Sequence, residues 1–356
     1  MAAIQFIQDL WFALPDQLRE VIVILVQILP LTVTVILCVA FLTYGERKII
    51  GYMQIRVGPN RVGPKGWFQP FADTIKLVIK EVVIPANSSR FLFVVAPLLA
   101  IVPALATWAV VPLFPGFAIA DIDAGLLYVL ALTSLSVYGI ILAGWASNSK
   151  YAILGGIRAS AQMISYELAL GIIVLIPIMM ANSMNLGEIV EAQRPIWFVF
   201  IQPLAAIVFF VAALAELQRA PFDLLEAEQE LSAGFNVEYA GMRFGMFFMA
   251  EYMKMISLSA IFATFFLGGY GGPFVDRLPW LGFIYIIAKI IFCLFLMIWI
   301  RASLPRFRYD QLMGFGWKGL LPIAVLNFIV TAVLIVMAEE GTLAPLLETI
   351  RGFFIG

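Results

Sequence analysis

Eight long apolar segments constrain what this chain can fold into. They lie at about residues 20–44, 91–113, 124–147, 162–182, 195–217, 241–266, 282–300 and 320–338. Each has roughly the 20 residues that an α-helix needs to cross the hydrocarbon core of a bilayer. Their apolar residues are continuous, whereas the strands of a membrane barrel alternate between apolar and polar positions. The sequence therefore predicts an all-α integral membrane protein with eight transmembrane helices in a single membrane domain, 1–356.

The composition agrees with a membrane protein and excludes several kinds of site. Of the 356 residues, 63% are hydrophobic and 13% are charged, which is too apolar for a soluble domain. A net charge of -1 does not suit a polybasic nucleic-acid binder. The chain has no histidine, and its two cysteines, Cys38 and Cys293, lie far apart in apolar segments. We therefore expect no metal site and no redox centre in this chain.

Lysine and arginine are distributed unevenly between the two sides of the predicted bundle. Fifteen of the 22 lie in the loops 45–90, 148–161, 218–240 and 301–319, and only four lie on the opposite side. By the positive-inside rule, these four loops face the cytoplasm or a mitochondrial matrix. An even number of spans then places both termini on the outer side. Apolar residues at helical spacing in 4–14 predict a short interfacial helix before the first span rather than a cleaved signal.

The first inner-face loop, 45–90, carries structural signals of its own. It contains a tandem pentapeptide, RVGPN followed by RVGPK, whose Gly-Pro pairs indicate turns. Farther along, apolar residues recur at helical spacing from Phe71 through Ile75 and Val78 to Val82. This spacing predicts an amphipathic helix over 67–82 that lies at the membrane surface or against a partner.

The ionisable residues within predicted spans or at their ends include Glu167, Glu216, Glu251, Lys254 and Lys289. Such groups are costly in a membrane and usually mark a path for ions or protons. Glu251 and Lys254 are three residues apart on a helix, so a structural ion pair and a functional role both remain open. Lys289 is assigned to a contact within the bundle.

The most charged stretch is ELQRAPFDLLEAEQE, residues 216–230, with five carboxylates and one arginine. Pro221 interrupts the preceding helix, and a short helix can start again at its first turn. In that helix Glu226 and Glu230 share one face, where like charges repel. Carboxylates crowded together in poor solvent share protons. A solvated loop is the simpler interpretation of this stretch alone, but together with the acids in the spans it indicates a proton relay.

Five stretches of the chain carry a family resemblance. They are GERKIIGYMQIRVGPNRVGPKG, QPFADTIKLVIKE, ISYELALG, AELQRAPFDLLEAEQELSAGFNVEYAGMRFGMFFMAEYMKM and RASLPRFRYDQLM. In this order they resemble the family of the H subunit of NADH-quinone oxidoreductase, the membrane subunit of respiratory complex I that is equivalent to mitochondrial NADH dehydrogenase subunit 1. The resemblance covers nearly the whole chain and rests on hydropathy alone at the termini.

The resemblance implies a non-redox subunit of a proton-pumping NADH:quinone oxidoreductase, a translocase of electron transport. Such a subunit forms part of the chamber for ubiquinone or menaquinone. It docks the peripheral arm, whose terminal iron-sulfur cluster reduces the quinone, and it begins a polar path toward antiporter-like subunits. Small membrane subunits and lipid are its other neighbours. Extra terminal length favours a bacterial plasma membrane, with periplasmic termini, over the mitochondrial inner membrane.

The resemblance also implies roles for individual residues. Its proton path corresponds to Asp73, Glu81, Glu167, Glu216, Glu226, Glu228, Glu230 and Glu251, with Arg219 and Arg301 as basic companions. Its quinone chamber, or the surface that docks the peripheral arm, corresponds to Glu46, Arg47, Arg56 and Arg61. For this second set, positive-inside anchoring and contact with the peripheral arm are as good an interpretation as direct contact with quinone.

Three other functions remain open from the sequence. A proton-coupled transporter also has intramembrane acids and broken helices, but it commonly shows paired repeats, and the stretch 216–230 has no counterpart in the first half. The related membrane subunit of an energy-converting hydrogenase would use a similar acid cluster, although the long first loop favours the quinone enzyme. A passive anchor for a peripheral enzyme leaves Glu167 and Glu251 unexplained at an energetic cost.

Overall fold

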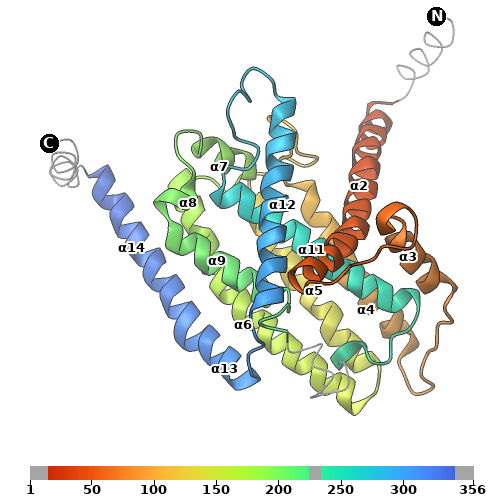
Figure 1. Ribbon diagram of the computed structural model, residues 1–356. Helices are drawn as coiled ribbons and strands as arrows, with labels where there is room; N and C mark the ends of the chain where they lie inside the picture. Colours follow the sequence, from red (N-terminus) through yellow and green to blue (C-terminus); the bar gives the residue numbers. More distant parts are fainter. Residues whose placement is uncertain (1–14, 224–233, 341–356) are drawn as a thin grey trace, which may run out of the picture.

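The computed structural model describes residues 15–223 and 234–340, and the regular structure in these ranges is helical. The long helices are α2 (Asp16–Met53), α4 (Arg90–Ala106), α5 (Gly125–Ala146), α6 (Lys150–Ala181), α11 (Met242–Phe266), α12 (Trp280–Ser303) and α14 (Leu321–Glu339) (Figure 1). The shorter ones are α3 (Gln69–Ile79), α7 (Leu186–Ala192), α8 (Phe198–Ile201), α9 (Pro203–Glu216) and α13 (Tyr309–Gly314), the last joined to α14 by a π-helical turn, Phe315–Leu320. The predicted all-α class is therefore confirmed for the described residues.

The predicted number of eight spans is not confirmed. Within the described ranges, seven helices are long and apolar enough to cross a membrane. The predicted span 195–217 is instead divided at Gln202 into α8 and α9. Helix α9 has 14 residues, or about 21 Å at the usual rise, which is shorter than a bilayer core of about 30 Å. Pro203 begins α9 where a missing N–H costs nothing, and the Gln202 side chain turns away to donate to Thr331 Oγ1 at 3.1 Å.

Two helices extend beyond their predicted ends. Helix α2 continues to Met53, so Glu46 and Arg47 lie on its last turns and not in the loop that follows. Helix α6 starts at Lys150, well before the predicted span at 162. Both extensions contain charged residues, which place them outside the apolar segments, but neither contains a residue that must end a helix.

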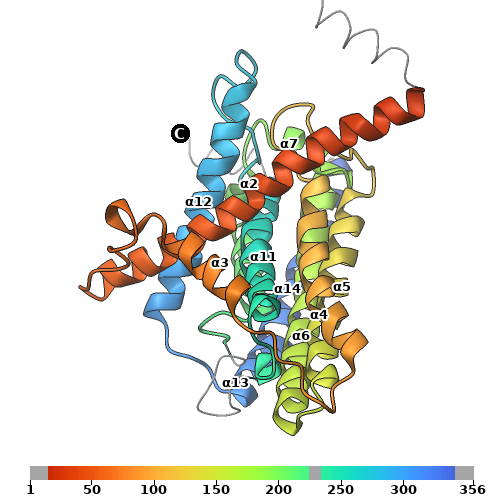
Figure 2. The ribbon, with the colours of Figure 1, turned by 90° about the vertical axis from the view of Figure 1, so that its right-hand side faces the viewer.

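The helices form a bundle around α11, the most deeply buried of the seven long helices in the described ranges. Helix α4 packs against α5 and α11, α5 packs against α6, and α6 packs against α9 and α14. Small residues along α11, such as Ala260 and Ala263, are fully buried and let neighbouring backbones approach. Figure 2 shows α2 slanting across the front of this bundle.

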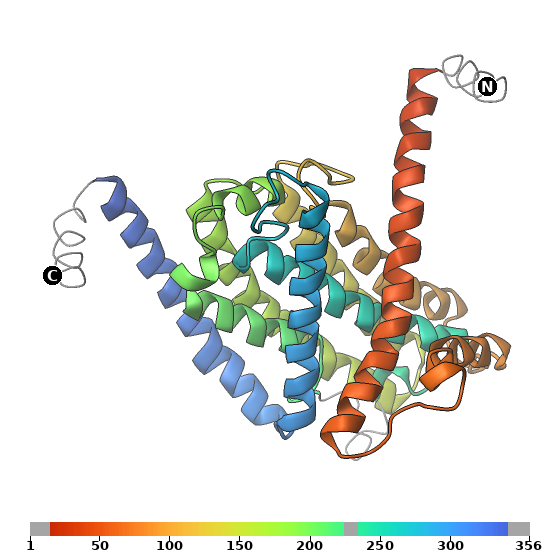
Figure 3. The ribbon, with the colours of Figure 1, turned by 45° about the horizontal axis from the view of Figure 1, so that its top comes forward.

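The first and last described helices flank the bundle. The beginning of α2 and the end of α14 both diverge from the centre, on opposite flanks (Figure 3). Large apolar side chains remain exposed there, including Val26 and Leu29 on α2 and Leu326 and Val333 on α14. In a membrane these surfaces would contact lipid or neighbouring subunits.

Helix α3 occupies the region of the predicted amphipathic helix 67–82. It packs against α2, where Phe41 meets Trp67 and Phe71 at ring-centroid distances of 5.9 and 6.1 Å. Its residue Ile75 is 58% exposed. The predicted helices in 4–14 and after Pro221 lie wholly or largely outside the described residues.

Candidate functional site

The site is organised by the segment that follows α9. The helix ends at Glu216, and Gln218 then takes a left-handed conformation with φ 54°, which turns the chain. The buried Gln162 of α6 donates from Nε2 to the carbonyls of Ala215 and Phe222, both at 2.8 Å. One side-chain amide therefore holds both ends of this segment and fixes the position of Arg219 between them.

Arg219 is the centre of a buried ion-pair network. Its Nη1 donates to both carboxylate oxygens of Glu46 on α2, at 2.9 and 2.8 Å, and its Nε donates to Glu251 on α11 at 2.8 Å. The guanidinium lies over the ring of Tyr252, 4.3 Å from the centroid. The Tyr252 hydroxyl donates to Glu46 at 2.7 Å. Both Arg219 and Glu46 are only 3% exposed at the side chain.

Arg219 keeps its positive charge in the folded protein. Burial lowers the pKa of its guanidinium, but the carboxylates of Glu251 and Glu46 outweigh burial, so the pKa lies well above its ordinary value. A buried charge without partners would be strongly destabilising, which is why carboxylates and a ring surround this guanidinium.

Helix α12 and the segment after it extend the network. Arg301, at the end of α12, forms a short contact from Nη1 to Glu46. Arg306 forms an ion pair with the buried Asp223 at 3.1 Å. The network thus joins α2, α11, α12 and the segment 217–223, which are far apart in sequence.

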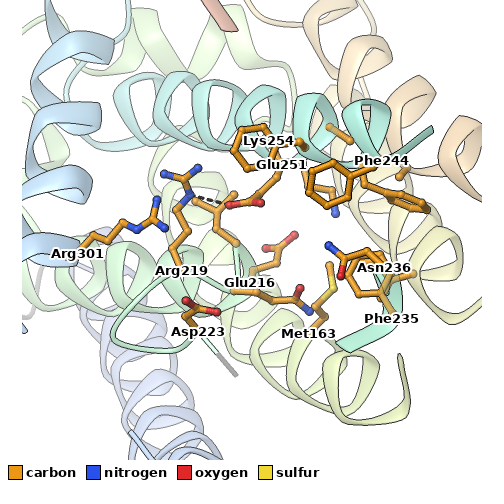
Figure 4. A pocket seen from close by; sticks show the side chains of 17 residues that line it. Met163, Glu216, Arg219, Asp223, Phe235, Asn236, Phe244, Glu251, Lys254 and Arg301 are labelled. Atoms are coloured by element: carbon orange, nitrogen blue, oxygen red, sulfur yellow. Dashed lines mark hydrogen bonds and ion pairs between the residues drawn. The ribbon is translucent and has the colours of Figure 1, made fainter. Parts of the chain in front are cut away.

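A partly open cavity of about 80 Å³ adjoins the network, large enough for a few water molecules. Its polar lining consists of Glu216, Gln218, Arg219, Asp223, Asn236, Glu251, Lys254 and Arg301. Figure 4 shows Glu216 pointing from the end of α9 toward Glu251 and Lys254 on α11. Glu216 is 3% exposed, and its Oε2 atom is buried without a hydrogen-bond partner. Glu251 and Asp223, the other acids of this cavity, each form an ion pair with an arginine. Glu216 is therefore the acid of this cavity that is least constrained by partners.

Glu167, on α6, is held by a hydroxyl group and not by an arginine. It accepts a short hydrogen bond from Ser134 of α5. A second, very small cavity of about 10 Å³ lies between α4, α5 and α11, and both Glu216 and Lys254 line it. Glu251 has its ion pair with Arg219, and none joins Glu251 to Lys254 in the part of the chain that the structure describes.

The remaining residues implied by the resemblance lie elsewhere. Asp73 on α3 binds Arg47 on α2 at 2.7 Å, at the α2–α3 corner. Glu81 is exposed after the end of α3, and Arg56 and Arg61 are exposed in the segment between α2 and α3. Glu226, Glu228 and Glu230 lie outside the described residues.

Three residues had a different role from sequence, or no assigned role. Glu46, expected at the quinone chamber or docking surface, is the acid to which Arg219 and Arg301 converge. Tyr252 and Ser134 supply the hydroxyl groups that bind Glu46 and Glu167. The available signal was position: Tyr252 directly follows Glu251 on a buried helix.

Lys289 has the bundle contact that the sequence indicated. Its Nζ donates to the carbonyls of Gly269 and Gly271, both at 2.7 Å, and lies 4.6 Å from the ring centroid of Trp197. It ties α12 to the loop between α11 and α12, away from the acid cluster. No group of three or more potential metal ligands occurs among residues 15–223 and 234–340.

Comparison with known proteins identifies the family. A family model described as NADH dehydrogenase matches residues 26–332. The H subunit of NADH-quinone oxidoreductase from Rickettsia canadensis (strain McKiel) is 54% identical over 310 residues, which is 85% of this chain and 91% of the relative. The one from Rhodospirillum centenum (strain ATCC 51521 / SW) is 52% identical over 312 residues, 87% of this chain and 93% of the relative. That of Rickettsia rickettsii (strain Iowa) is 50% identical over 331 residues, 91% and 97% respectively. The matched region contains every residue of the ion-pair network, and the chain therefore belongs to the NADH dehydrogenase family, alongside these H subunits of NADH-quinone oxidoreductase.

Proposed function

We propose that this chain is the membrane subunit that couples quinone reduction to proton translocation in an NADH-quinone oxidoreductase. It lines part of the quinone chamber and docks the peripheral arm. Its carboxylates transmit the change in charge that follows quinone reduction. The observation that carries the proposal is the position of Glu216, buried, without a partner at Oε2, and beside a cavity that the ion-pair network also lines.

The α2–α3 corner suits the apolar part of a quinone. An isoprenoid quinone has a long apolar tail and a polar headgroup, so it needs a passage from lipid that ends at polar groups. Phe41, Trp67 and Phe71 form a cluster of rings at this corner, and all three are more than one-third exposed. The Arg47–Asp73 ion pair lies at the same corner. We propose that the tail passes here and that the headgroup reaches the junction with the peripheral arm.

The segment between α2 and α3 suits protein docking. Ile55 and Val57 are 97% and 76% exposed, and Arg56 and Arg61 beside them are exposed as well. Exposed apolar residues among bases are typical of a surface that another protein covers. The positive-inside orientation predicts that this segment faces the inner side, and we expect the peripheral arm on that side.

The network supplies the coupling. Reduction of a quinone by two electrons consumes two protons, and charge that appears near a site of low dielectric changes the proton affinity of nearby acids. Each tenfold change in such an affinity is about 1.4 kcal/mol. In this proposal Arg219 holds Glu46 and Glu251 in ion pairs, while Glu216 takes up and releases the proton. The change in protonation at Glu216 then acts on Glu167 and on the neighbouring pumping subunits.

The test is Glu216→Gln in the intact complex, assayed in vesicles. Quinone-linked NADH oxidation and proton pumping should fall by roughly an order of magnitude or more, because a positioned proton-transfer group contributes at least that much. NADH oxidation by a hydrophilic artificial acceptor should persist, since that reaction needs only the peripheral arm. Glu188→Gln, an exposed acid on α7, is the matched control and should change neither activity.

Assembly must be measured for each variant, because an unassembled complex also lacks quinone activity. A fully assembled Glu216→Gln complex with normal quinone turnover and normal pumping would refute the proposal. The purified chain alone, placed in vesicles, should move no solute; uptake of a solute would favour the transporter function instead.

A further inference from the structure

A third and larger cavity, which we call the outer cavity, lies at the end of the bundle opposite the ion-pair network. Its volume is about 520 Å³, within the range of about 300–1,000 Å³ that is usual for ligand sites. It is lined by the segment between α4 and α5, by α7 and the segment after it, and by the loop between α11 and α12. Figure 1 shows α7 and this last loop at the end of the bundle opposite α13. The positive-inside orientation predicts that this end faces the outer side of the membrane.

Buried polar contacts fix the walls of the outer cavity. Gln193, which is buried, donates from Nε2 to the carbonyl of Thr264 at 2.8 Å and accepts at Oε1 from the amide of Gly268 at 3.0 Å. Gly268 has a left-handed φ of 71°, and a Cβ atom there would lie 2.8 Å from Cδ1 of Trp197. Lys289 donates to two carbonyls of the same loop and lies over the ring of Trp197. The cavity is therefore preformed, and binding of a ligand loses little free energy in ordering its walls.

The outer cavity presents charges of both signs to water. Arg194 lines it and forms ion pairs with Glu191 at 3.2 Å and with Asp276, on the facing loop, at 3.5 Å. The side chains of Arg194 and Asp276 are 57% and 88% exposed, and ion pairs in contact with water contribute little free energy. A ligand with charges of both signs can therefore replace this pairing: its phosphate accepts from the arginine, and its ammonium group binds the aspartate.

An exposed apolar surface continues from the outer cavity along α8 and α9. Phe200, Leu204 and Ile207 form it, and they are 73%, 44% and 61% exposed. The ring of Phe200 stacks with that of Trp197, which lines the cavity, at a centroid distance of 6.2 Å. Tryptophan rings commonly lie at the level of the lipid headgroups. Apolar side chains that continue from that level into the membrane are suited to contact acyl chains.

We propose that the outer cavity binds the headgroup of a zwitterionic phospholipid, such as phosphatidylethanolamine, whose acyl chains lie along α8 and α9. Arg194 binds the phosphate, and Asp276 binds the ammonium group. The sequence of features, two opposite charges followed by an apolar surface, matches an amphiphile of this class. The site shares no residue with the ion-pair network, so this inference goes beyond the proposed function and does not depend on it.

The first test uses phosphatidylethanolamine with a photoreactive diazirine in one acyl chain. The intact complex is placed in vesicles of phosphatidylethanolamine and phosphatidylglycerol with a trace of this probe, irradiated and analysed by peptide mass spectrometry. We expect labelling of residues 196–207. Arg194→Gln should lower that labelling by about tenfold, the effect of losing a charge-assisted hydrogen bond.

Two controls accompany this test. Arg277→Gln removes another exposed base of the loop that carries Asp276, but Arg277 lies outside the lining of the cavity, so labelling should stay at the wild-type level. Labelling of the exposed face of α14, which includes Leu326 and Val333, reports contact with bulk lipid and should be the same in all variants. Because Arg194 and Arg277 are both exposed, neither substitution should prevent folding.

The second test asks which charges of the headgroup are recognised. A probe with glycerol in place of ethanolamine keeps the phosphate and lacks the ammonium group. The wild-type complex should be labelled several times more strongly at 196–207 by the ethanolamine probe. Asp276→Asn should remove this preference, whereas Arg194→Gln should lower labelling by both probes. Soluble phosphoethanolamine, which has no acyl chains, should not compete at the concentration of the lipid probe.

Three results would overturn the proposal. Equal labelling of 196–207 in the wild type and in Arg194→Gln would show contact with bulk lipid only. Absence of labelling at 196–207 in the wild type, while α14 is labelled, would show that a neighbouring subunit covers the cavity. Full competition by soluble phosphoethanolamine would make the cavity a site for a water-soluble ligand.

Discussion

Arg219 donates from Nη1 to both carboxylate oxygens of Glu46, at 2.9 and 2.8 Å, across 173 positions of the sequence. The contact ties the last turns of α2 to the segment that follows α9. A buried ion pair adds little net stability by itself, but removal of one partner leaves the other as an uncompensated charge in a dry site. The residues around Arg219 should therefore respond to substitution as a unit.

Arg219→Met should destabilise the subunit by about 3–5 kcal/mol, because it leaves the buried Glu46 and also Glu251 without their cation. Thermal unfolding of the purified complex and the yield of assembled complex measure this. Arg219→Lys should recover only part of the loss, since an ammonium group cannot reproduce the donors of Nε and Nη1 together. Full stability in the methionine variant would contradict the central position of Arg219.

The same variant has a defined pH dependence. The pKa of Arg219 is raised in the folded protein by the carboxylates of Glu251 and Glu46, so its stabilising effect is complete at every pH below the unfolded pKa and is lost only as the pH rises through the folded one. The stability gap between wild type and Arg219→Met should therefore stay constant from about pH 7 to 9. At lower pH it should narrow, because the carboxylates left without a cation take up protons. A gap that widens toward acid pH would contradict this account.

Glu46→Gln should impair assembly more than Glu251→Gln. Glu46 accepts from Arg219, Arg301 and Tyr252 and is 3% exposed, whereas Glu251 is 30% exposed at the side chain and, among the described residues, forms an ion pair with Arg219 alone. Water can replace part of what Glu251 supplies but not what Glu46 supplies. The measurement is the amount of intact complex in native gels. Glu81→Gln, at an exposed acid, is the control, and an order with Glu251 as the more sensitive residue would sink the prediction.

Tyr252 makes two contacts that substitution can separate. Tyr252→Phe removes the hydroxyl that donates to Glu46 at 2.7 Å and should cost about 1.5–3 kcal/mol, as for a hydrogen bond to a charged group. Tyr252→Leu also removes the ring over Arg219, and the added loss should be about 1–2 kcal/mol beyond the lost volume. Thermal inactivation of the assembled complex gives both numbers. Equal losses in the two variants would show that the ring contributes nothing.

Much of the fold could be predicted because a membrane helix is recognisable within one segment. The seven long helices overlap predicted spans, and α3 lies inside the predicted helix 67–82. The break at Gln202 could not be predicted, since a proline such as Pro203 is tolerated in an apolar span. The extension of α2 beyond residue 44 was missed because the apolar segment ends there, although no residue at that point ends the helix, which continues to Met53.

Only part of the candidate site could be predicted from the sequence. That Glu216, Arg219 and Glu251 act together was an expectation from family resemblance, and in the structure these three side chains line one cavity. The place of Glu46 in their network could not be read from one sequence, because its partner is 173 positions away. Lys254 was left open between an ion pair with Glu251 and a functional role. Its surroundings depend on how α6, α9 and α11 pack, which no local pattern specifies.

The segment between α2 and α3 gives a last prediction, about docking. Arg56 and Arg61 are exposed beside Ile55 and Val57, so reversal of their charges should weaken binding of the peripheral arm without disturbing the bundle. We expect the double variant Arg56→Glu, Arg61→Glu to release the arm as a soluble NADH dehydrogenase, active with a hydrophilic acceptor. Release should increase with salt, since screening removes what attraction remains. Arg277→Glu, an exposed base in the loop between α11 and α12, lies on the predicted outer side and should retain the arm. Retention of the arm by the double variant at all salt concentrations would place the docking surface elsewhere.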